Sequence, residues 1–383
     1  MQRNGAFIHS DEIERYHYPP ECPFKTERAS LTKSILRSMS LYESQGTREM
    51  PPRPATDSEL GLFHTPEYLA ALRRISLGDF QSGDFALGLG TPDTPPFADL
   101  YPYTELAVGA TITGVELLLD RSVDFVFNPS GGYHHAFPAI AGGFCYINDM
   151  AIACKILQKN GKRVFCLDLD AHHGNGTQSA FYAESEVFTV SFHESGRSLF
   201  PWSGFEDEIG EGKGFGYNVN VPLPAGTDDD AFIFAFRNIV PALLDFYKPD
   251  VIVLEIGMDI LSVDPLTHLN MTNNAIADTL PDIISTGIPL LVTGGGGYNP
   301  EHTARGWALA WTILCGNEPA TDLSIGMGGT FLGSTEWSAG LRDGRIYARG
   351  DEKNEIRQQV EHIVATIRNM VFPLHEIPPL HAR

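Results

Sequence analysis

The chain has 383 residues, 43% of them hydrophobic and 20% charged, so it can bury a large core and is not a disordered or low-complexity protein. Its 27 basic and 48 acidic residues leave a formal charge of −21, which argues against direct nucleic-acid binding and against an anionic membrane surface. No apolar run reaches the roughly 20 residues that span a bilayer, and residues 1–5 do not resemble a secretory signal. We therefore expect a cytoplasmic protein. Five widely spread cysteines predict buried thiols rather than a disulfide framework.

Short β-branched or aromatic runs alternate along the chain with longer segments of helical periodicity. The short runs predict buried strands at residues 125–127, 164–169, 187–192, 251–254 and 290–293. The helical patterns lie between them, at residues 105–119, 150–158, 229–246 and 275–285. This spacing is what the crossovers of a parallel sheet require. The pattern predicts an α/β fold, with a mostly parallel, doubly wound sheet flanked by helices.

The remaining segments add detail to this fold. Pro241 is expected to kink or divide the helix that contains it. Two Gly- and Pro-rich stretches, residues 88–102 and 326–333, are interpreted as surface loops. Apolar residues recur at helical spacing over 356–371 and predict a last helix packed by one face. We expect a single domain over residues 1–383, with 318–383 assigned to no motif beyond that helix.

Polar residues follow each predicted strand, and the carboxyl ends of parallel strands form the usual ligand site of an open sheet. Asp170 and His172 stand two apart at one strand end, and Asp259 follows another. Two carboxylates and an imidazole suit a divalent ion, and three ligands leave a position for water or substrate, as in a catalytic site. Taken alone, an Asp-x-His pair is more often an N-cap beside a core histidine.

A pair of histidines and a tyrosine are candidates for acid–base chemistry and oxyanion stabilisation. His134 and His135 follow two glycines, and one carboxylate, Asp168, and one amide, Asn175, are candidate partners for their rings. The alternative is a pair of loop histidines without a chemical role. Tyr298 follows four glycines and can donate a hydrogen bond to a developing oxyanion if it faces the metal, or it can be a loop aromatic that covers the sheet. The glycine run lacks the Lys-Ser/Thr of a phosphate-binding loop.

Several motifs in register now identify a resemblance. They are GGYHHA, GGFCYIND, DLDAHHGNGTQ, SFHES, EIGMD and GGGGYNP, together with residues 28–30 and 64–69. In this order they resemble the histone deacetylase family, including the bacterial histone deacetylase-like amidohydrolases and acetoin-utilisation proteins. The resemblance covers the chain to about Cys315 and implies an arginase/deacetylase-like fold and zinc-dependent hydrolysis of an N-acetyl-lysine amide.

The resemblance also implies a role for individual residues. Asp170, His172 and Asp259 match the zinc ligands, and Tyr298 matches the tyrosine that binds the substrate carbonyl. His134 and His135 match the paired histidines, with Asp168 behind the first and Asn175 behind the second. Gly143, Phe144 and Phe200 match the walls of a tube for the lysine stem, and Arg28 matches an arginine of the acetate cavity. A potassium ion is implied beside the metal, bound by Asp168, Asp170, His172, Ser191 and Phe192.

The chain departs from the family pattern at two positions, and there are several alternatives to the implied function. Many members have a carboxylate where this chain has Asn175, which affects the pKa of His135, and Met258 replaces a small residue. An arginase-like enzyme with two manganese ions would need acids where Gly174 and Gly257 stand, so one metal is expected. The ligand set accepts iron(II) as well as zinc.

The substrate is an acetylated lysine side chain or another acetylated amine, such as a polyamine or small metabolite, and a non-catalytic acetyl-lysine reader is the other alternative. Asp93, Asp99 and Glu105 do not single out a carboxylate at the rim, and the oligomeric state is open.

Overall fold

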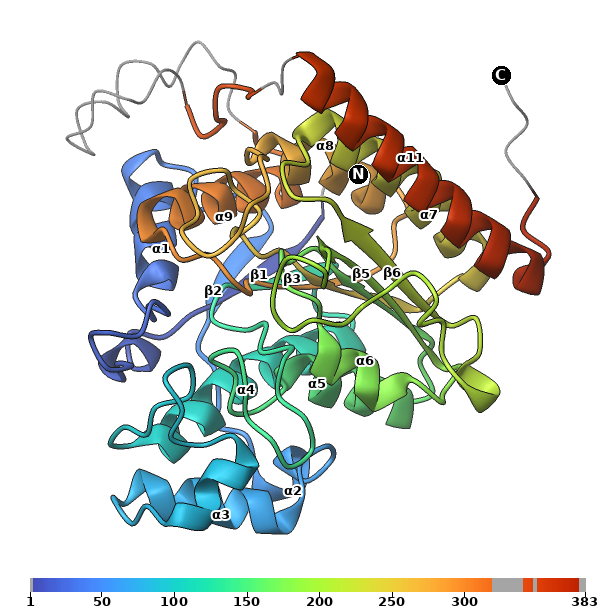
Figure 1. The fold of residues 1–383 in the computed structure, drawn as a ribbon. Helices are drawn as coiled ribbons and strands as arrows, with labels where there is room; N and C mark the ends of the chain where they lie inside the picture. The colour runs from blue at the N-terminus through green and yellow to red at the C-terminus, as the bar shows by residue number, and fades with distance from the viewer. Residues whose placement is uncertain (1–2, 319–339, 347–349, 379–383) are drawn as a thin grey trace.

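An eight-stranded sheet runs through the centre of the computed structural model, which describes residues 3–318, 340–346 and 350–378 (Figure 1). The strand order is β2-β1-β3-β8-β7-β4-β5-β6, and every pairing is parallel. The strands are β1 Gly5–Ile8, β2 Thr47–Met50, β3 Phe125–Asn128, β4 Val164–Asp168, β5 Val187–Glu194, β6 Asn218–Leu223, β7 Val251–Glu255 and β8 Leu290–Thr293. The predicted parallel α/β sheet is therefore confirmed.

The five predicted strands form the middle of the sheet, and the three outer strands β1, β2 and β6 were not predicted. β2 has the sequence TREM and lies at an edge, half exposed, so it lacks the apolar run that marks a buried strand. β6 lies at the other edge, contains Pro222 and interleaves asparagine with valine. β1 is only four residues long. Such edge and short strands depend on their neighbours more than on their own sequence.

Helices cover both faces of the sheet (Figure 1). On one face lie α1 Arg28–Ser38, α7 Asp229–Tyr247, α8 Asn274–Ile284, α9 Pro300–Leu314 and α11 Gly350–Val371. On the other face lie α2 Asp57–Leu60, α3 Pro66–Ser76, α4 Leu100–Leu119, α5 Asp149–Lys159 and α6 Asn175–Phe181. The short 3-10 helices are η1 Ile13–Arg15, η2 Ser82–Leu87, η3 Gly212–Gly214 and η4 Phe372–His375.

Two hydrophobic cores result, one on each side of the sheet. Along β4, Phe165 and Leu167 belong to the core under α7, α8, α9 and α11, whereas Val164 and Cys166 belong to the core under α4 and α5. Successive side chains of a strand point to opposite faces, so a strand covered on both sides is apolar at every position. This explains why the central strands could be recognised from their sequence.

Several smaller expectations can be compared with the structure. α7 runs through Pro241 without a break, because Pro241 is exposed and the carbonyl that it frees can be solvated. The predicted loop over 88–102 is wrong at its end, since α4 begins at Leu100. The predicted loop at 326–333 lies outside the described residues. The C-terminal helix is confirmed as α11, and all five cysteines are free thiols.

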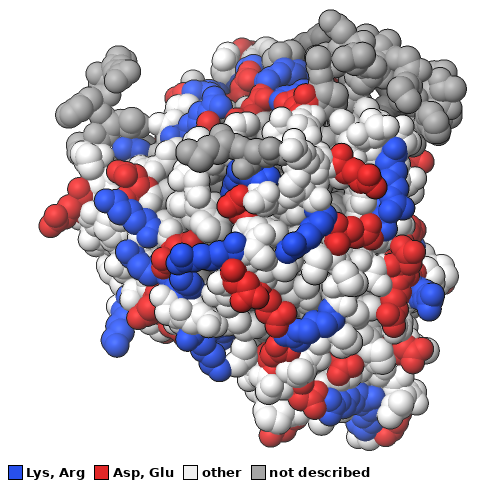
Figure 2. Space-filling model, turned by 180° about the vertical axis from the view of Figure 1, so that it is seen from behind, with Lys and Arg blue, Asp and Glu red and all other residues white. Residues whose placement is uncertain are grey.

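The rear surface of the molecule mixes acidic and basic side chains (Figure 2). Lysine and arginine lie beside aspartate and glutamate over this face, so its charges compensate one another locally despite the net charge of −21. In the described ranges, no helix combines the length and the apolar character that a membrane crossing requires.

Candidate metal centre and active site

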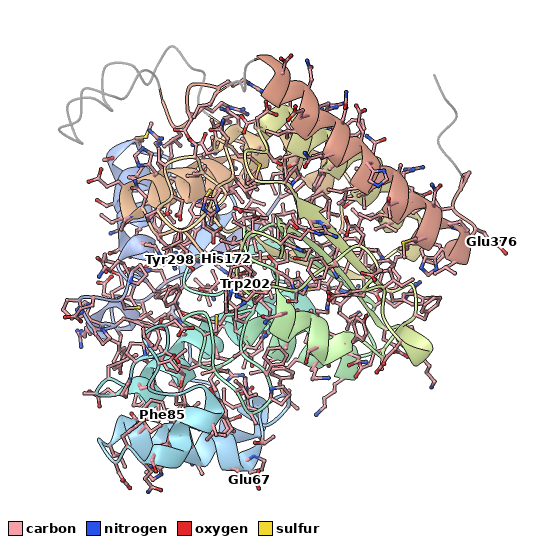
Figure 3. The ribbon with its side chains drawn as sticks, viewed as in Figure 1. Glu67, Phe85, His172, Trp202, Tyr298 and Glu376 are labelled. Carbon is pink, nitrogen blue, oxygen red and sulfur yellow. The ribbon has the colours of Figure 1, made fainter. Side chains whose placement is uncertain are left out.

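The residues singled out by sequence meet at the carboxyl ends of the central strands. β3 leads into the loop with His134 and His135, β4 into Asp170 and His172, and β7 into Asp259. Figure 3 places His172 and Tyr298 in the middle of the molecule, whereas Glu67 and Glu376 lie at its periphery. Parallel strands therefore deliver residues far apart in sequence to one point, as the sheet rule requires.

Asp170, His172 and Asp259 form a compact buried group. Nδ1 of His172 lies 2.8 Å from Oδ2 of Asp259 and 3.3 Å from Oδ1 of Asp170. Their remaining oxygens are held by the backbone, since Gly296 N–H donates to Oδ2 of Asp170 at 2.6 Å and Ala171 N–H to Oδ1 of Asp259 at 2.9 Å. The ligand atoms all lie within 4.8 Å of one another, so one ion can contact all three residues.

The electrostatics of this group fit a cation. Burial, together with the neighbouring Asp170, raises the pKa of Asp259 to about 7. Burial by itself would lower the pKa of His172, but its hydrogen bonds with Asp170 and Asp259 outweigh this effect and raise the pKa to about 10. Two buried carboxylates side by side are unfavourable unless a positive charge compensates them. A divalent ion supplies that charge, and this donor set suits zinc or iron(II).

The glycines around this group exclude further acidic ligands. A Cβ added at Gly257 would lie 2.2 Å from Oδ2 of Asp170, and one added at Gly174 would lie 2.3 Å from Oδ2 of Asp168. These are the two positions where a two-manganese enzyme would need carboxylates. Met258, which replaces a smaller residue, packs toward Gly306 of α9, where a Cβ would lie 2.4 Å from its sulfur. The Met258 side chain therefore points away from the metal group.

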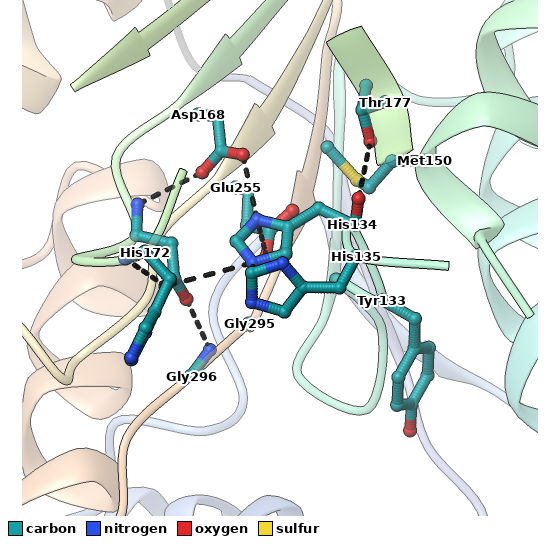
Figure 4. A network of polar contacts seen from close by, with 12 residues as sticks. Tyr133, His134, His135, Met150, Asp168, His172, Thr177, Glu255, Gly295 and Gly296 are labelled. Atoms are coloured by element: carbon teal, nitrogen blue, oxygen red, sulfur yellow. Dashed lines mark hydrogen bonds and ion pairs between the residues drawn. The ribbon is translucent and has the colours of Figure 1, made fainter. Parts of the chain in front are cut away.

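The paired histidines form a chain of contacts beside the metal group (Figure 4). Nδ1 of His134 lies 2.8 Å from Oδ2 of Asp168, and Nε2 of His134 lies 3.1 Å from Nε2 of His135. Nδ1 of His135 in turn lies 2.9 Å from Oδ1 of Asn175, the first residue of α6. Both rings are buried. The two candidate partners thus contact the two rings that the sequence analysis paired with them.

The surroundings shift the pKa values of His134 and His135 in opposite directions. Burial opposes protonation of His134, but Asp168 and Asp170 outweigh it and raise the pKa of His134. The pKa of His135 is lowered well below its usual value by burial and by the neighbouring His134 and His172. Asn175 is a neutral partner and only orients the His135 ring. The surroundings therefore favour the protonated form of His134 and the neutral form of His135.

Tyr298 and three further residues border the same space. The ring of Tyr298 lies 5.4 Å from the Phe144 ring and 6.2 Å from the His172 ring, centroid to centroid. Burial raises the pKa of Tyr298 well above its usual value, so its hydroxyl stays protonated and can donate. Phe200, 36% exposed, lies 5.1 Å from the ring of His135. At Gly143, a Cβ would lie 2.2 Å from the His135 ring, so only glycine fits there.

Arg28 lies against the glycine run rather than free in a cavity. Its Nη1 donates to the carbonyls of Gly295 at 3.0 Å and Gly297 at 2.9 Å, and its guanidinium stacks over Phe24 and Trp307. The cavity beside it measures about 10 Å³, enough for about one water molecule. In this structure, Arg28 therefore braces the loop that carries Tyr298.

The five residues implied for potassium lie together on adjacent strands. Asp168, the last residue of β4, pairs in register with Ser191 of β5, and Phe192 follows Ser191. Asp170 and His172 lie just beyond the end of β4. Ser191 Oγ lies 2.8 Å from Nδ1 of His193. The arrangement brings the five residues together without showing an ion.

Comparison with known proteins places the whole arrangement in a family. The sequence model of the histone deacetylase domain family matches residues 22–314 of this chain. The chain belongs to the histone deacetylase family. The acetoin utilization protein AcuC of Bacillus subtilis (strain 168) is 37% identical over 331 residues, covering 84% of each chain. An HDAC homolog from Aquifex aeolicus has a TM-score of 0.82 at 34% identity, covering 94% of this chain and all of that one. A structure of an HDAC homolog complexed with SAHA has a TM-score of 0.83 at 32% identity, covering 95% of this chain and all of that one.

Within this histone deacetylase fold, the GGFCYIND segment holds the histidine loop, which the sequence analysis did not predict. Asn148 caps α5 and donates to the carbonyls of His134 and Ala136, both at 3.1 Å. Asp149 accepts from the backbone N–H groups of Gly132 and Tyr133. An Asn-Asp pair before an apolar helical pattern is a cap signal, but its link to a distant loop cannot be inferred from spacing.

Asp264 is another residue that the sequence analysis missed, and it gives a first prediction. Its Oδ2 accepts the backbone N–H of Tyr298 at 2.7 Å, and its Oδ1 accepts that of Leu266 at 2.9 Å. Asp264→Ala should lower kcat by roughly 10- to 100-fold with little change in KM, because it frees the segment that positions Tyr298. Asp264→Asn keeps one acceptor and should lose less. Steady-state kinetics on an acetyl-lysine peptide check this, and full kcat in the alanine variant would contradict it.

Proposed function

We propose that this histone deacetylase family member is a zinc-dependent hydrolase that removes an acetyl group from a lysine-like amine. The observation that carries the proposal is the convergence of Asp170, His172 and Asp259 beside the His134–His135 pair and Tyr298. Its similarity to HDAC homologs of known structure supports the proposal. We further propose that one catalytic domain occupies the chain and that it acts in the cytoplasm.

The walls of the site favour an acetylated lysine side chain. Phe144 is half-buried beside Tyr298, and Phe200 borders His135 and is partly exposed, so an aromatic lining leads from the surface to the metal group. Aromatic faces accept a methylene chain, and the apolar stem of lysine is such a chain. The related HDAC homolog complexed with SAHA supports a ligand entering this space. Acetylated polyamines also carry an acetamide on a methylene chain, so the assay below includes one as a second substrate.

The ions are assigned to the groups that fit them. Asp170, His172 and Asp259 would hold zinc or iron(II), and a bound divalent ion supplies Lewis acidity that polarises an amide carbonyl and acidifies water. Asp168 and Ser191, with backbone oxygens of Asp170, His172 and Phe192, would hold potassium. The buried carboxylates near these positions give both cations an electrostatic reason to bind.

The side chains divide the proton transfers between them. His135, neutral and oriented by Asn175, accepts a proton from the attacking water at Nε2 and returns it to the departing amine. His134, whose protonated form Asp168 and Asp170 favour, stabilises the negative charge that develops beside it. Tyr298 donates its hydroxyl proton in a hydrogen bond to the oxyanion formed from the carbonyl oxygen. Gly143 and Arg28 shape the space and hold the Tyr298 loop.

The direct test measures acetate released from an acetyl-lysine peptide and from an acetylpolyamine, each with and without a metal chelator. We expect chelator-sensitive release from the peptide, with a higher kcat/KM than for the polyamine. A higher kcat/KM for the polyamine would contradict the preference for acetyl-lysine and indicate an acetylpolyamine as the substrate. Tight peptide binding without turnover would favour a non-catalytic reader, in contradiction to the enzyme.

The neutral partner of His135 gives a pH prediction. In Asn175→Asp, a carboxylate beside the ring favours its protonated form and raises the pKa of His135. The base form is then lost at a higher pH, so the acidic limb of the kcat/KM profile should move upward by about one pH unit. Asn160→Asp, at the exposed end of α5, is the matched control and should leave the profile in place. An unmoved or lowered limb in Asn175→Asp would show that His135 is not the titrating base.

A further inference from the structure

Glu255 is a buried acid to which the mechanism above gives no task. It is the last residue of β7 and is fully buried. Within the described part of the chain, neither oxygen of its carboxyl group has a hydrogen-bond partner. A buried polar group left in this state is costly, so its presence calls for a functional reason.

The Glu255 carboxyl group contacts one of the paired histidines, His134 (Figure 4). Oε1 of Glu255 lies 3.2 Å from Nδ1 of His134, the same atom that lies 2.8 Å from Oδ2 of Asp168. Nδ1 of His134 therefore has two carboxyl groups beside it: Asp168 makes the hydrogen bond, and Glu255 makes an ion-pair contact. The partner ring, His135, has only the neutral Asn175 at its Nδ1.

The backbone packs closely around the carboxyl group of Glu255. A Cβ added at Gly295 would lie 2.7 Å from Oε1 of Glu255, and one added at Gly132 would lie 3.0 Å from it. Two glycine segments, one before the histidine pair and one before Tyr298, thus close around this side chain. A group held so tightly against His134 limits how far that ring can rotate.

We propose that Glu255 is a positioning residue for His134: its carboxyl group lies at Nδ1 as an alternative acceptor to Asp168 and keeps Nε2 of that ring directed at His135. The inference rests on the proposed function and extends it by one residue. Asp168 alone would fix the proton on Nδ1 but allow the ring to tilt about a single bond. Two carboxyl groups beside one N–H confine the ring orientation more closely than one.

The rival reading is that His134, Asp170 and Glu255 hold a second metal ion, since their ligand atoms also lie within 4.8 Å of one another. A metal on Nδ1 of His134 would displace the proton that Asp168 accepts. Metal analysis of the purified protein separates the two readings. We expect one divalent ion per chain in the native protein and in Glu255→Gln, and two ions in the native protein with one lost in the variant would overturn the proposal.

The kinetic test compares Glu255→Gln with Glu255→Leu. The amide keeps an oxygen acceptor for the Nδ1 proton, so its kcat should stay within about threefold of the native value, whereas leucine fills the space without accepting and should lower kcat roughly tenfold with KM unchanged. Combined with Asp168→Asn, the leucine variant should lose more than the product of the two single losses, because the proton then has no carboxyl acceptor. Equal losses in the glutamine and leucine variants, or a simple product, would overturn the proposal.

A spectroscopic readout keeps the proposal testable if the leucine variant does not fold or the chain proves inactive. In protein with ¹⁵N-labelled histidine, the Nδ1 proton of His134 should give a low-field resonance that is absent from His134→Ala and shifts in Glu255→Gln. Glu194→Gln is the matched control, because Glu194 is also a buried glutamate beside a histidine, His268, outside this network. A resonance that moves equally in both variants, or in neither, would contradict the assignment.

Discussion

Tyr298→Phe is expected to lower kcat by roughly 100- to 1,000-fold while KM changes by less than about threefold. The ring stays between Phe144 and His172, so substrate binding is preserved, and only the hydroxyl is lost. In the proposed mechanism that hydroxyl acts in the transition state, where the carbonyl oxygen becomes an oxyanion, so its removal should affect the chemical step and not the ground state. Steady-state kinetics on an acetyl-lysine peptide give both constants.

Tyr217→Phe is the matched control for this variant. The substitution removes the same hydroxyl group, but Tyr217 packs against Tyr247 and His375 and not against the residues of the candidate metal site. Its kcat should equal that of the native chain. A Tyr298→Phe variant with unchanged kcat would remove the role given to Tyr298.

Asp259→Asn should release the metal and abolish turnover. The substitution takes a negative charge from a group whose other members are Asp170 and His172, and it leaves the neutral amide with a backbone N–H donor already at its Oδ1 position. We expect the metal content to fall well below one ion per chain and the activity to fall by more than the roughly 10- to 100-fold typical of residues that only support a ligand.

The control for Asp259→Asn is Asp207→Asn, which changes an exposed carboxylate of the same chemistry. It should keep both metal and activity. If Asp259→Asn kept one tightly bound ion and native kcat, Asp259 would not be a ligand. Added zinc at high concentration should restore part of the activity of Asp259→Asn if loss of metal is the only defect.

The sequence predicted the central strands because each is buried on both faces. Val164 to Leu167 alternate between two cores and are therefore apolar at every position, a pattern that needs no structural information to recognise. β2, with the residues TREM, is stabilised by pairing with β1 rather than by an apolar face. Its position depends on a long-range contact, and for this reason local sequence did not reveal it.

The candidate site likewise contains residues that the sequence predicted and residues that it did not. The order of strand ends and the rule on where ligands bind were enough to bring Asp170, His172 and Asp259 to one point. The tasks of Glu255 and Asp264 could not be predicted, because each depends on a partner from another strand end, His134 in one case and Tyr298 in the other. The position of Arg28 depends likewise on two carbonyls more than 260 residues away.

The most direct test of the account is a titration of metal-free protein with zinc, in which bound metal and acetate release are measured together. We predict that the activity on an acetyl-lysine peptide is absent without metal, rises in proportion to bound zinc and reaches its maximum at one ion per chain. Activity that persists in metal-free protein, or that needs two ions per chain, would contradict a single centre built from Asp170, His172 and Asp259.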